Sequence, residues 1–159
     1  MIDLKTAVSK LDMPDFLSEG EDLEGKCADM VLVNADNKIL LLKRPETDDL
    51  FPGKWCLPGG HRQDDETIRQ GAERECQEES GIEIDGISHK LFNWVYPDGF
   101  KTTFFWAKQG TDWYDQQDVK LSDEHVDYKW VTSKEAFSMD LSGDLATPLK
   151  KIFSEIGIN

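Results

Sequence analysis

The most regular pattern of apolar residues lies in two short runs near the start of the chain. Residues 27–34 are CADMVLVN and residues 38–44 are KILLLKR, with the polar turn NADN between the two runs. Asn and Asp favour tight turns, so the two runs predict an antiparallel β-hairpin. The run ILLL does not alternate apolar with polar residues, and this predicts a strand that is buried on both faces.

Shorter apolar runs later in the chain predict further strands. The stretch WCLPGG at residues 55–60 follows a loop at residues 45–54 and predicts a short strand that ends at Pro and two glycines. The tripeptide PDG at residues 97–99 predicts a second hairpin, because it separates two runs that are rich in aromatic and β-branched residues. The strands expected in this part of the chain lie at residues 82–84, 90–96, 100–108 and 126–132.

One long helix and two C-terminal helices complete the prediction. The long helix is expected to begin between Asp64 and Glu66, with Asp64 or Asp65 capping its first N–H groups, and to end at Gly81. The stretches KEAFSM and TPLKKIFSEI predict the two later helices. Strands and helices in this order favour an α/β fold, specifically an α/β/α sandwich around a mixed sheet.

Length, charge and cysteine content narrow the class of protein. A chain of 159 residues fits one ordinary domain, and we expect an N-terminal extension at residues 1–24 followed by a domain at residues 25–159. The formal net charge of −14 argues against binding of a nucleic-acid polymer. No apolar run approaches the roughly 20 residues that span a membrane. The three cysteines have no CxxC spacing, which predicts reduced thiols and a cytoplasmic protein.

A cluster of acids on the predicted long helix is the strongest candidate for chemistry. Glu75, Glu78 and Glu79 are three or four residues apart or adjacent, which places their side chains on one helical face. Such a face is most often a solvated surface, but clustered carboxylates also suit a hard cation such as Mg²⁺. The two glycines that end WCLPGG would let backbone carbonyl groups approach that cation, and Arg74 could orient a carboxylate.

The residues around this cluster favour a cation-binding site over a solvated surface. Starting at Gly60, the chain has the spacing G-x5-E-x7-R-E-C-x-E-E-x-G-I, which ends at Ile82. This spacing resembles the Nudix box, Gx5Ex7REUxEExGU, in which U is a bulky aliphatic residue. Every fixed position matches, and the one departure is Cys76 at the first aliphatic position. Cys packs as a small apolar side chain, so the departure affects packing more than chemistry.

The resemblance to the MutT-like Nudix hydrolase family extends over residues 26–153. It implies a Nudix-type α/β/α fold with a loop-helix-loop catalytic motif. It also implies hydrolysis of a nucleoside diphosphate linked to another moiety, with Mg²⁺ or Mn²⁺ as cofactor. The metal ligands that it implies are Glu75, Glu78, Glu79 and the carbonyl group of Gly59. The supporting residues are Glu66 and Arg74, and the residue expected to contact substrate phosphate is Arg44.

The residue that activates the attacking water stays open at this point. The candidates are Glu75, Glu78 and an acid of the loop before residues 126–132, either Asp123 or Glu124. We take Glu124, with the two helix residues, as the catalytic set. Asp123 and Glu124 fit a solvated turn equally well, and Arg44 fits an ordinary surface charge equally well.

The substrate is the feature that the sequence determines least. Pro97 follows Ile82 by fifteen residues, a spacing that resembles ADP-ribose pyrophosphatases and favours a nucleotide sugar or an ADP-ribose-like compound. Pro-Asp-Gly is also an ordinary turn, and the chain equally resembles nucleoside triphosphate pyrophosphohydrolases that cleanse the nucleotide pool. A nucleotide sensor without hydrolysis is a third alternative. The expected partners are a small nucleotide and a second copy of the chain, since Nudix proteins are often homodimers. The aromatic residues considered for stacking on the nucleotide are Trp94, Trp106 and Trp113.

Overall fold

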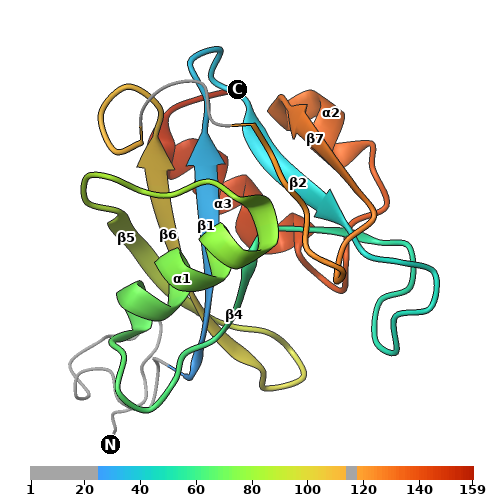
Figure 1. Ribbon diagram of the computed structural model, residues 1–159. Helices are drawn as coiled ribbons and strands as arrows, with labels where there is room; N and C mark the ends of the chain where they lie inside the picture. Colours follow the sequence, from blue (N-terminus) through green and yellow to red (C-terminus); the bar gives the residue numbers. More distant parts are fainter. Residues whose placement is uncertain (1–24, 114–117) are drawn as a thin grey trace, which may run out of the picture.

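The computed structural model describes residues 25–113 and 118–159 (Figure 1). The N-terminal extension expected at residues 1–24 lies outside the described residues. In the described part, a sheet separates helix α1, Ile68–Ser80, from helix α3, Ala146–Ile156 (Figure 1). This layered arrangement is the α/β/α sandwich that the sequence predicts.

Seven strands of the described residues form one sheet. Its main order is β3-β2-β1-β6-β5, while β4 pairs with β1 and β7 pairs with β2. The pair β1–β6 is parallel and the other pairs are antiparallel, so the sheet is mixed as predicted. The strands are β1 Cys27–Val33, β2 Ile39–Lys43, β3 Trp55–Cys56, β4 Gly59–His61, β5 His89–Val95, β6 Lys101–Lys108 and β7 Asp127–Val131.

Both predicted hairpins are present. β1 and β2 pair with Val33 opposite Ile39, and Asn37 in the turn between them has a positive φ of 60°. β5 and β6 pair around the PDG turn, where the N–H group of Tyr96 donates to the carbonyl group of Phe100 at 2.8 Å. The ILLL run of β2 is fully buried, because its alternate side chains enter the cores on the two faces of the sheet.

The strand predicted at residues 82–84 is wrong, since this segment has no regular secondary structure. Ile82 is fully buried, which explains the apolar signal. Its N–H group donates to Oγ of Ser80 at 3.1 Å and is therefore not available to a neighbouring strand. The short apolar run marks a contact with the core, because a buried side chain alone does not require sheet pairing.

Helix α1 begins later than the sequence predicts, and its cap is a different residue. Oγ1 of Thr67 accepts the N–H group of Gln70 at 3.1 Å, while Oε1 of Gln70 accepts the N–H group of Thr67 at 2.9 Å. This reciprocal capping box satisfies two N–H groups that the helix leaves unpaired. The expected caps, Asp64 and Asp65, are therefore wrong. The helix ends as predicted at Gly81, which has a left-handed φ of 79°.

Alternate residues of β1 enter two separate cores. The core under α1 contains Met30 and Cys76, and the core under α3 contains Val31 and Ile152. Cys76 is fully buried there, so it takes the apolar position that the Nudix box reserves for an aliphatic residue. All three cysteines are buried free thiols. The short helix α2, Ser133–Phe137, follows β7 and packs against it.

Candidate metal and nucleotide site

Helix α1 lies against strand β4, and the glycines of β4 allow this close approach. A Cβ atom on Gly60 would lie 2.6 Å from the carboxylate of Glu75, so a side chain there would displace that carboxylate. Gly59 donates its N–H group to Oε1 of Glu79 at 3.0 Å. The glycine pair therefore meets the acid cluster, as the sequence predicts, and does so here through an N–H group.

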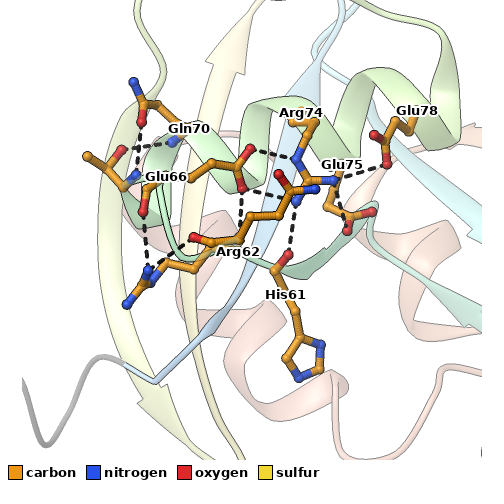
Figure 2. Close-up of polar contacts among 9 residues, drawn as sticks. His61, Arg62, Glu66, Gln70, Arg74, Glu75 and Glu78 are labelled. Atoms are coloured by element: carbon orange, nitrogen blue, oxygen red, sulfur yellow. Dashed lines mark hydrogen bonds and ion pairs between the residues drawn. The ribbon is translucent and has the colours of Figure 1, made fainter.

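Arg74 connects the acids of the cluster (Figure 2). Its guanidinium binds both carboxylate oxygens of Glu66, from Nε at 2.6 Å and from Nη2 at 3.1 Å. Its Nη1 lies 3.1 Å from Glu78 and 3.4 Å from Glu75, and its Nη2 also donates to the carbonyl group of His61 at 3.0 Å. These contacts raise the pKa of Arg74 and lower the pKa of Glu66. The bidentate pair thus fixes the loop before α1 to the helix.

The three helix glutamates lie in different environments. Glu79 is buried, with 6% of its surface exposed. Burial raises the pKa of Glu79 to about 9 despite the N–H group of Gly59, and the carboxylates of Glu75 and Glu124 add to the rise. Burial also raises the pKa of Glu75. Glu78, by contrast, has 56% of its side chain exposed. Two carboxylates buried side by side repel each other unless a proton or a cation joins them.

A cavity of about 770 Å³ opens beside these acids. Its lining includes Gly59, Glu75 and Glu79, together with Glu124 from the loop before β7 and Arg44 after β2. The fold therefore brings Glu124 and Arg44 to the helix acids from distant parts of the sequence. The volume lies within the range of about 300–1,000 Å³ that is typical of small-molecule sites.

Two of the residues considered from the sequence lie apart from the cavity. Glu78 contacts Arg74, and Asp123 is exposed in the turn before β7. Neither side chain lines the cavity. Across residues 25–113 and 118–159, no three side chains of His, Cys, Asp or Glu stand together in an arrangement that could hold a metal ion. The protein's own donors, Arg74 and the N–H group of Gly59, occupy the carboxylates instead.

The donor set nevertheless suits a divalent cation. Glu75, Glu79 and Glu124 bring carboxylate oxygens to the same cavity, and oxygen is the ligand that Mg²⁺ and Mn²⁺ prefer. The absence of a side chain at Gly60 keeps space beside the carboxylate of Glu75, since a Cβ atom would fill it. A cation bound between buried carboxylates would also convert their repulsion into a shared attraction.

Arg44 is held in place at the cavity by Asp48. Its Nη2 lies 2.9 Å from Oδ1 of Asp48. The other carboxylate oxygen accepts the N–H groups of Leu50 and Phe51 at 3.1 and 2.8 Å. These hydrogen bonds lower the pKa of Asp48 to about 2 and order the loop at residues 45–54. A guanidinium fixed in this way beside a cavity can hold a phosphate group.

Sequence reasoning missed several residues of the cavity. Phe51, Tyr96 and Phe100 line it, and so does Asp29 of β1, which pairs with Gly59. Asp29 accepts the hydroxyl group of Thr102 at 2.8 Å, and burial raises the pKa of Asp29 to about 6. Asp29 is the one charged residue in the apolar run CADMVLV, and this break in the pattern could have identified it. The aromatic residues lie in a loop and a turn, where no periodic pattern marks them.

The tryptophans considered for stacking on a nucleotide do not line the cavity. Trp113 is buried and stacks on Trp130, with the ring centroids 5.9 Å apart. The ring of Trp106 packs beside that of His89, with the ring centroids 5.3 Å apart. Trp94 packs against the core under α3. The stacking expectation was therefore wrong for these residues, because large apolar rings contribute most when they fill the interior.

Comparison with known proteins settles the family. The NUDIX domain matches residues 24–155. The chain belongs to the Nudix family. The nucleoside triphosphatase NudI of Escherichia coli O81 (strain ED1a) is 27% identical over 121 residues, which are 70% of this chain and 84% of that protein. The structure of the MutT protein from Methanosarcina mazei Go1 is 28% identical with a TM-score of 0.63, and the match covers 81% of this chain and 92% of that one. An Ap4A hydrolase from C. elegans, in a binary complex, is 26% identical with a TM-score of 0.63 over 83% of this chain and 98% of that one.

These comparisons confirm the family that the Nudix box predicts, together with its α/β fold. The protein is a MutT-like Nudix hydrolase, of the pyrophosphohydrolase class. Members of this family generally use divalent metal ions, typically Mg²⁺, and small nucleotides fit them as substrates. In the part of the chain that the structure describes, no helix combines the length and apolar character needed to cross a membrane.

Proposed function

We propose that this Nudix hydrolase cleaves the pyrophosphate bond of a nucleoside triphosphate, with a divalent cation held at the acid cluster. The observation that supports this most directly is that carboxylates and the guanidinium of Arg44 line the same cavity. Triphosphate oxygens match both, because a cation held by the carboxylates would supply positive charge to attract them, while the guanidinium of Arg44 can bind them directly. The similarity to a nucleoside triphosphatase supports the same class of substrate.

A nucleoside diphosphate linked to another moiety, which the sequence favoured, becomes the second candidate. That preference rested on the position of Pro97. In the structure Pro97 lies in a hairpin turn that is closed by hydrogen bonds of 2.8 Å from Tyr96 to Phe100 and from Gly99 to Tyr96. The turn accounts for the Pro-Asp-Gly sequence without any substrate. Pro97 also lines the cavity, and this position is the observation that supports the second candidate substrate.

In this proposal Glu75 and Glu79 hold the cation, and Glu78 and the carbonyl group of Gly59 are further ligands. Glu78 would exchange Arg74 for the ion, a movement that is open to a side chain with 56% of its surface exposed. A divalent cation bound there supplies positive charge that attracts phosphate oxygens and favours loss of a proton from water. Mg²⁺ is the proposed ion, and Mn²⁺ can replace it because both take oxygen ligands.

The protein's own groups orient the substrate and accept a proton. Arg44, held by Asp48, binds a phosphate group. Glu124 lines the same cavity as Glu79, and its carboxylate helps to raise the pKa of Glu79. We propose that the carboxylate of Glu124 takes the proton of the attacking water, with Glu75 as the alternative base. The water oxygen bonds to a phosphorus atom and the bridging oxygen leaves, which yields a nucleoside monophosphate and pyrophosphate.

A substrate panel tests the proposal. Nucleoside triphosphates, ADP-ribose and a nucleotide sugar are each incubated with the full chain in Mg²⁺, in Mn²⁺ and in EDTA. We expect release of pyrophosphate from nucleoside triphosphates, and EDTA should abolish it. Faster cleavage of ADP-ribose or of the nucleotide sugar would favour the second candidate. Binding of nucleotides without cleavage of any of them would instead indicate a nucleotide sensor.

A further inference from the structure

The cavity extends beyond the residues that hydrolysis uses. The aromatic side chains of its lining, which we call the aromatic end, are Phe51 from the loop after β2 and Tyr96 and Phe100 from the turn between β5 and β6. Phe51 and Phe100 have 36% and 48% of their surface exposed. Apolar rings gain free energy when they leave water. A ligand that covered these rings would therefore bind more tightly than one that reached only the acids.

Polar contacts hold the aromatic rings in place before any ligand arrives. Asp48 accepts the N–H group of Phe51 at 2.8 Å, and Asp98 accepts the N–H group of Phe100 at 3.0 Å. The rings of Tyr96 and Phe100 lie 6.1 Å apart with an angle of 38° between their planes. Because both segments are already ordered, a ligand would not have to supply the free energy of ordering them.

Residues 142–145 line the same cavity as these two segments. A Cβ atom on Gly143 would lie 3.4 Å from the ring of Phe51, so this ring packs against that glycine. Burial raises the pKa of Tyr96, and the charges of Asp29 and Asp144 add to the rise. Phe51, Tyr96, Gly143 and Asp144 all line the same cavity. In Figure 1 the loop after β2 and the β5–β6 turn both lie toward the lower end of the sheet.

We propose that Phe51, Tyr96 and Phe100 form the binding site for the nucleobase of the substrate, by stacking against its planar ring. This inference rests on the proposed function, in which the phosphates of the same nucleotide lie at the acid cluster. Stacking suits any base, since every base has a π face. Asp48 links the two contacts, because one carboxylate oxygen binds the phosphate-contacting Arg44 and the other holds the backbone of Phe51.

Substitutions at Phe51 separate stacking from apolar packing. Phe51→Leu keeps an apolar side chain but removes the planar ring, whereas Phe51→Tyr keeps the ring. Phe100→Leu repeats the test on the opposite segment. Phe137→Leu is the matched control, because Phe137 of α2 is 38% exposed and does not line the cavity. Thermal unfolding of each variant shows that it is folded.

Two kinetic measurements distinguish binding of the base from binding of the phosphates. The first is kcat/KM for a nucleoside triphosphate, and the second is the inhibition constant of inorganic tripolyphosphate, which has the phosphates without a base. We expect Phe51→Leu and Phe100→Leu to lower kcat/KM about tenfold and to leave inhibition by tripolyphosphate unchanged. Phe51→Tyr, which keeps the ring, should retain more of kcat/KM than Phe51→Leu does. Phe137→Leu should match the unsubstituted protein.

The failures of the two proposals are distinguishable. If the unsubstituted protein cleaves no nucleotide, the proposed function fails. If it cleaves nucleotides and neither leucine variant changes kcat/KM, or if both variants weaken tripolyphosphate inhibition equally, only the base site is refuted. A change of oligomeric state in Phe51→Leu with unchanged kinetics would show that the rings form an interface between copies of the chain, and would also overturn the inference.

Discussion

The acidic end and the aromatic end of the cavity are built in different ways. The acidic end rests on helix α1 and strand β4, where Arg74 binds three glutamates and Gly59 binds Glu79. The aromatic end rests on a loop and a turn, each ordered by one aspartate, Asp48 or Asp98. Regular elements fix the spacing of ligands, whereas loops can vary in sequence without changing the fold. In this protein the proposed metal ligands Glu75 and Glu79 stand on helix α1, and the rings proposed for recognition stand on a loop and a turn.

Glu79→Gln at the acidic end should have the largest effect on activity. Gln has nearly the same shape but no charge, so the cation loses its buried ligand. We expect kcat with Mg²⁺ to fall about a hundredfold to a thousandfold. The melting temperature of the metal-free protein should not fall, because burial raises the pKa of Glu79 to about 9 and so already favours its neutral form, which an amide resembles.

Glu155→Gln is the control for this change, since Glu155 lies on α3 and pairs only with Lys151 among the contacts described for it. Its kcat should equal that of the unsubstituted protein. Near-normal turnover in Glu79→Gln would remove Glu79 from the proposed metal site. It would also show that the two ends of the cavity do not differ in the way described above.

Arg74→Lys should have an intermediate effect. Lys keeps the positive charge but cannot form the two parallel hydrogen bonds that Arg74 makes with Glu66. The loop before α1 and the orientation of the acids should loosen, with a fall in kcat of about tenfold to a hundredfold. KM for the nucleotide should change little, because Arg74 does not line the cavity. Arg69→Lys, an exposed residue of the same helix, should have no effect. A rise in KM with normal kcat would contradict a supporting role for Arg74.

Asp48→Asn should have the smallest effect, at the point where the two ends meet. The neutral amide weakens the ion pair with Arg44, whose side chain is partly exposed. We expect KM for a nucleoside triphosphate to rise by up to about fivefold, with kcat unchanged. Inhibition by tripolyphosphate should weaken in parallel, unlike in Phe51→Leu, because Arg44 contacts phosphate. Unchanged inhibition by tripolyphosphate would show that Asp48 does not support phosphate binding by Arg44.

The same contrast explains which features the sequence predicted. The buried strand β2, both hairpins and the helix end at Gly81 follow from local patterns of apolar residues, turn residues and glycine. The helix start was predicted wrongly, because Asp64 and Asp65 were taken as caps although Thr67 and Gln70 have the spacing of a capping box. The false strand at residues 82–84 arose because a buried side chain does not by itself require a strand.

In the candidate site, too, the residues related by a local pattern could be predicted from the sequence. The acids of α1 could be grouped from their helical spacing alone, and the contact of Glu78 with Arg74 is an ordinary pair four residues apart. Phe51 and Phe100 could not be placed at the cavity, since no local pattern relates a loop to a distant turn. Both residues line one cavity although β2 and the β5–β6 hairpin lie on opposite sides of β1 in the sheet, and this order is a property of the whole fold.

The central claim is that Glu75 and Glu79 hold a divalent cation beside the cavity. A crystal structure of the protein in Mn²⁺, with the ion located by its anomalous scattering, tests it most directly. The account predicts an ion at about 2.0–2.2 Å from carboxylate oxygens of both residues, with Glu78 turned away from Arg74. An ion bound elsewhere, or carboxylates that still hold Arg74 and the N–H group of Gly59 with no ion between them, would contradict it.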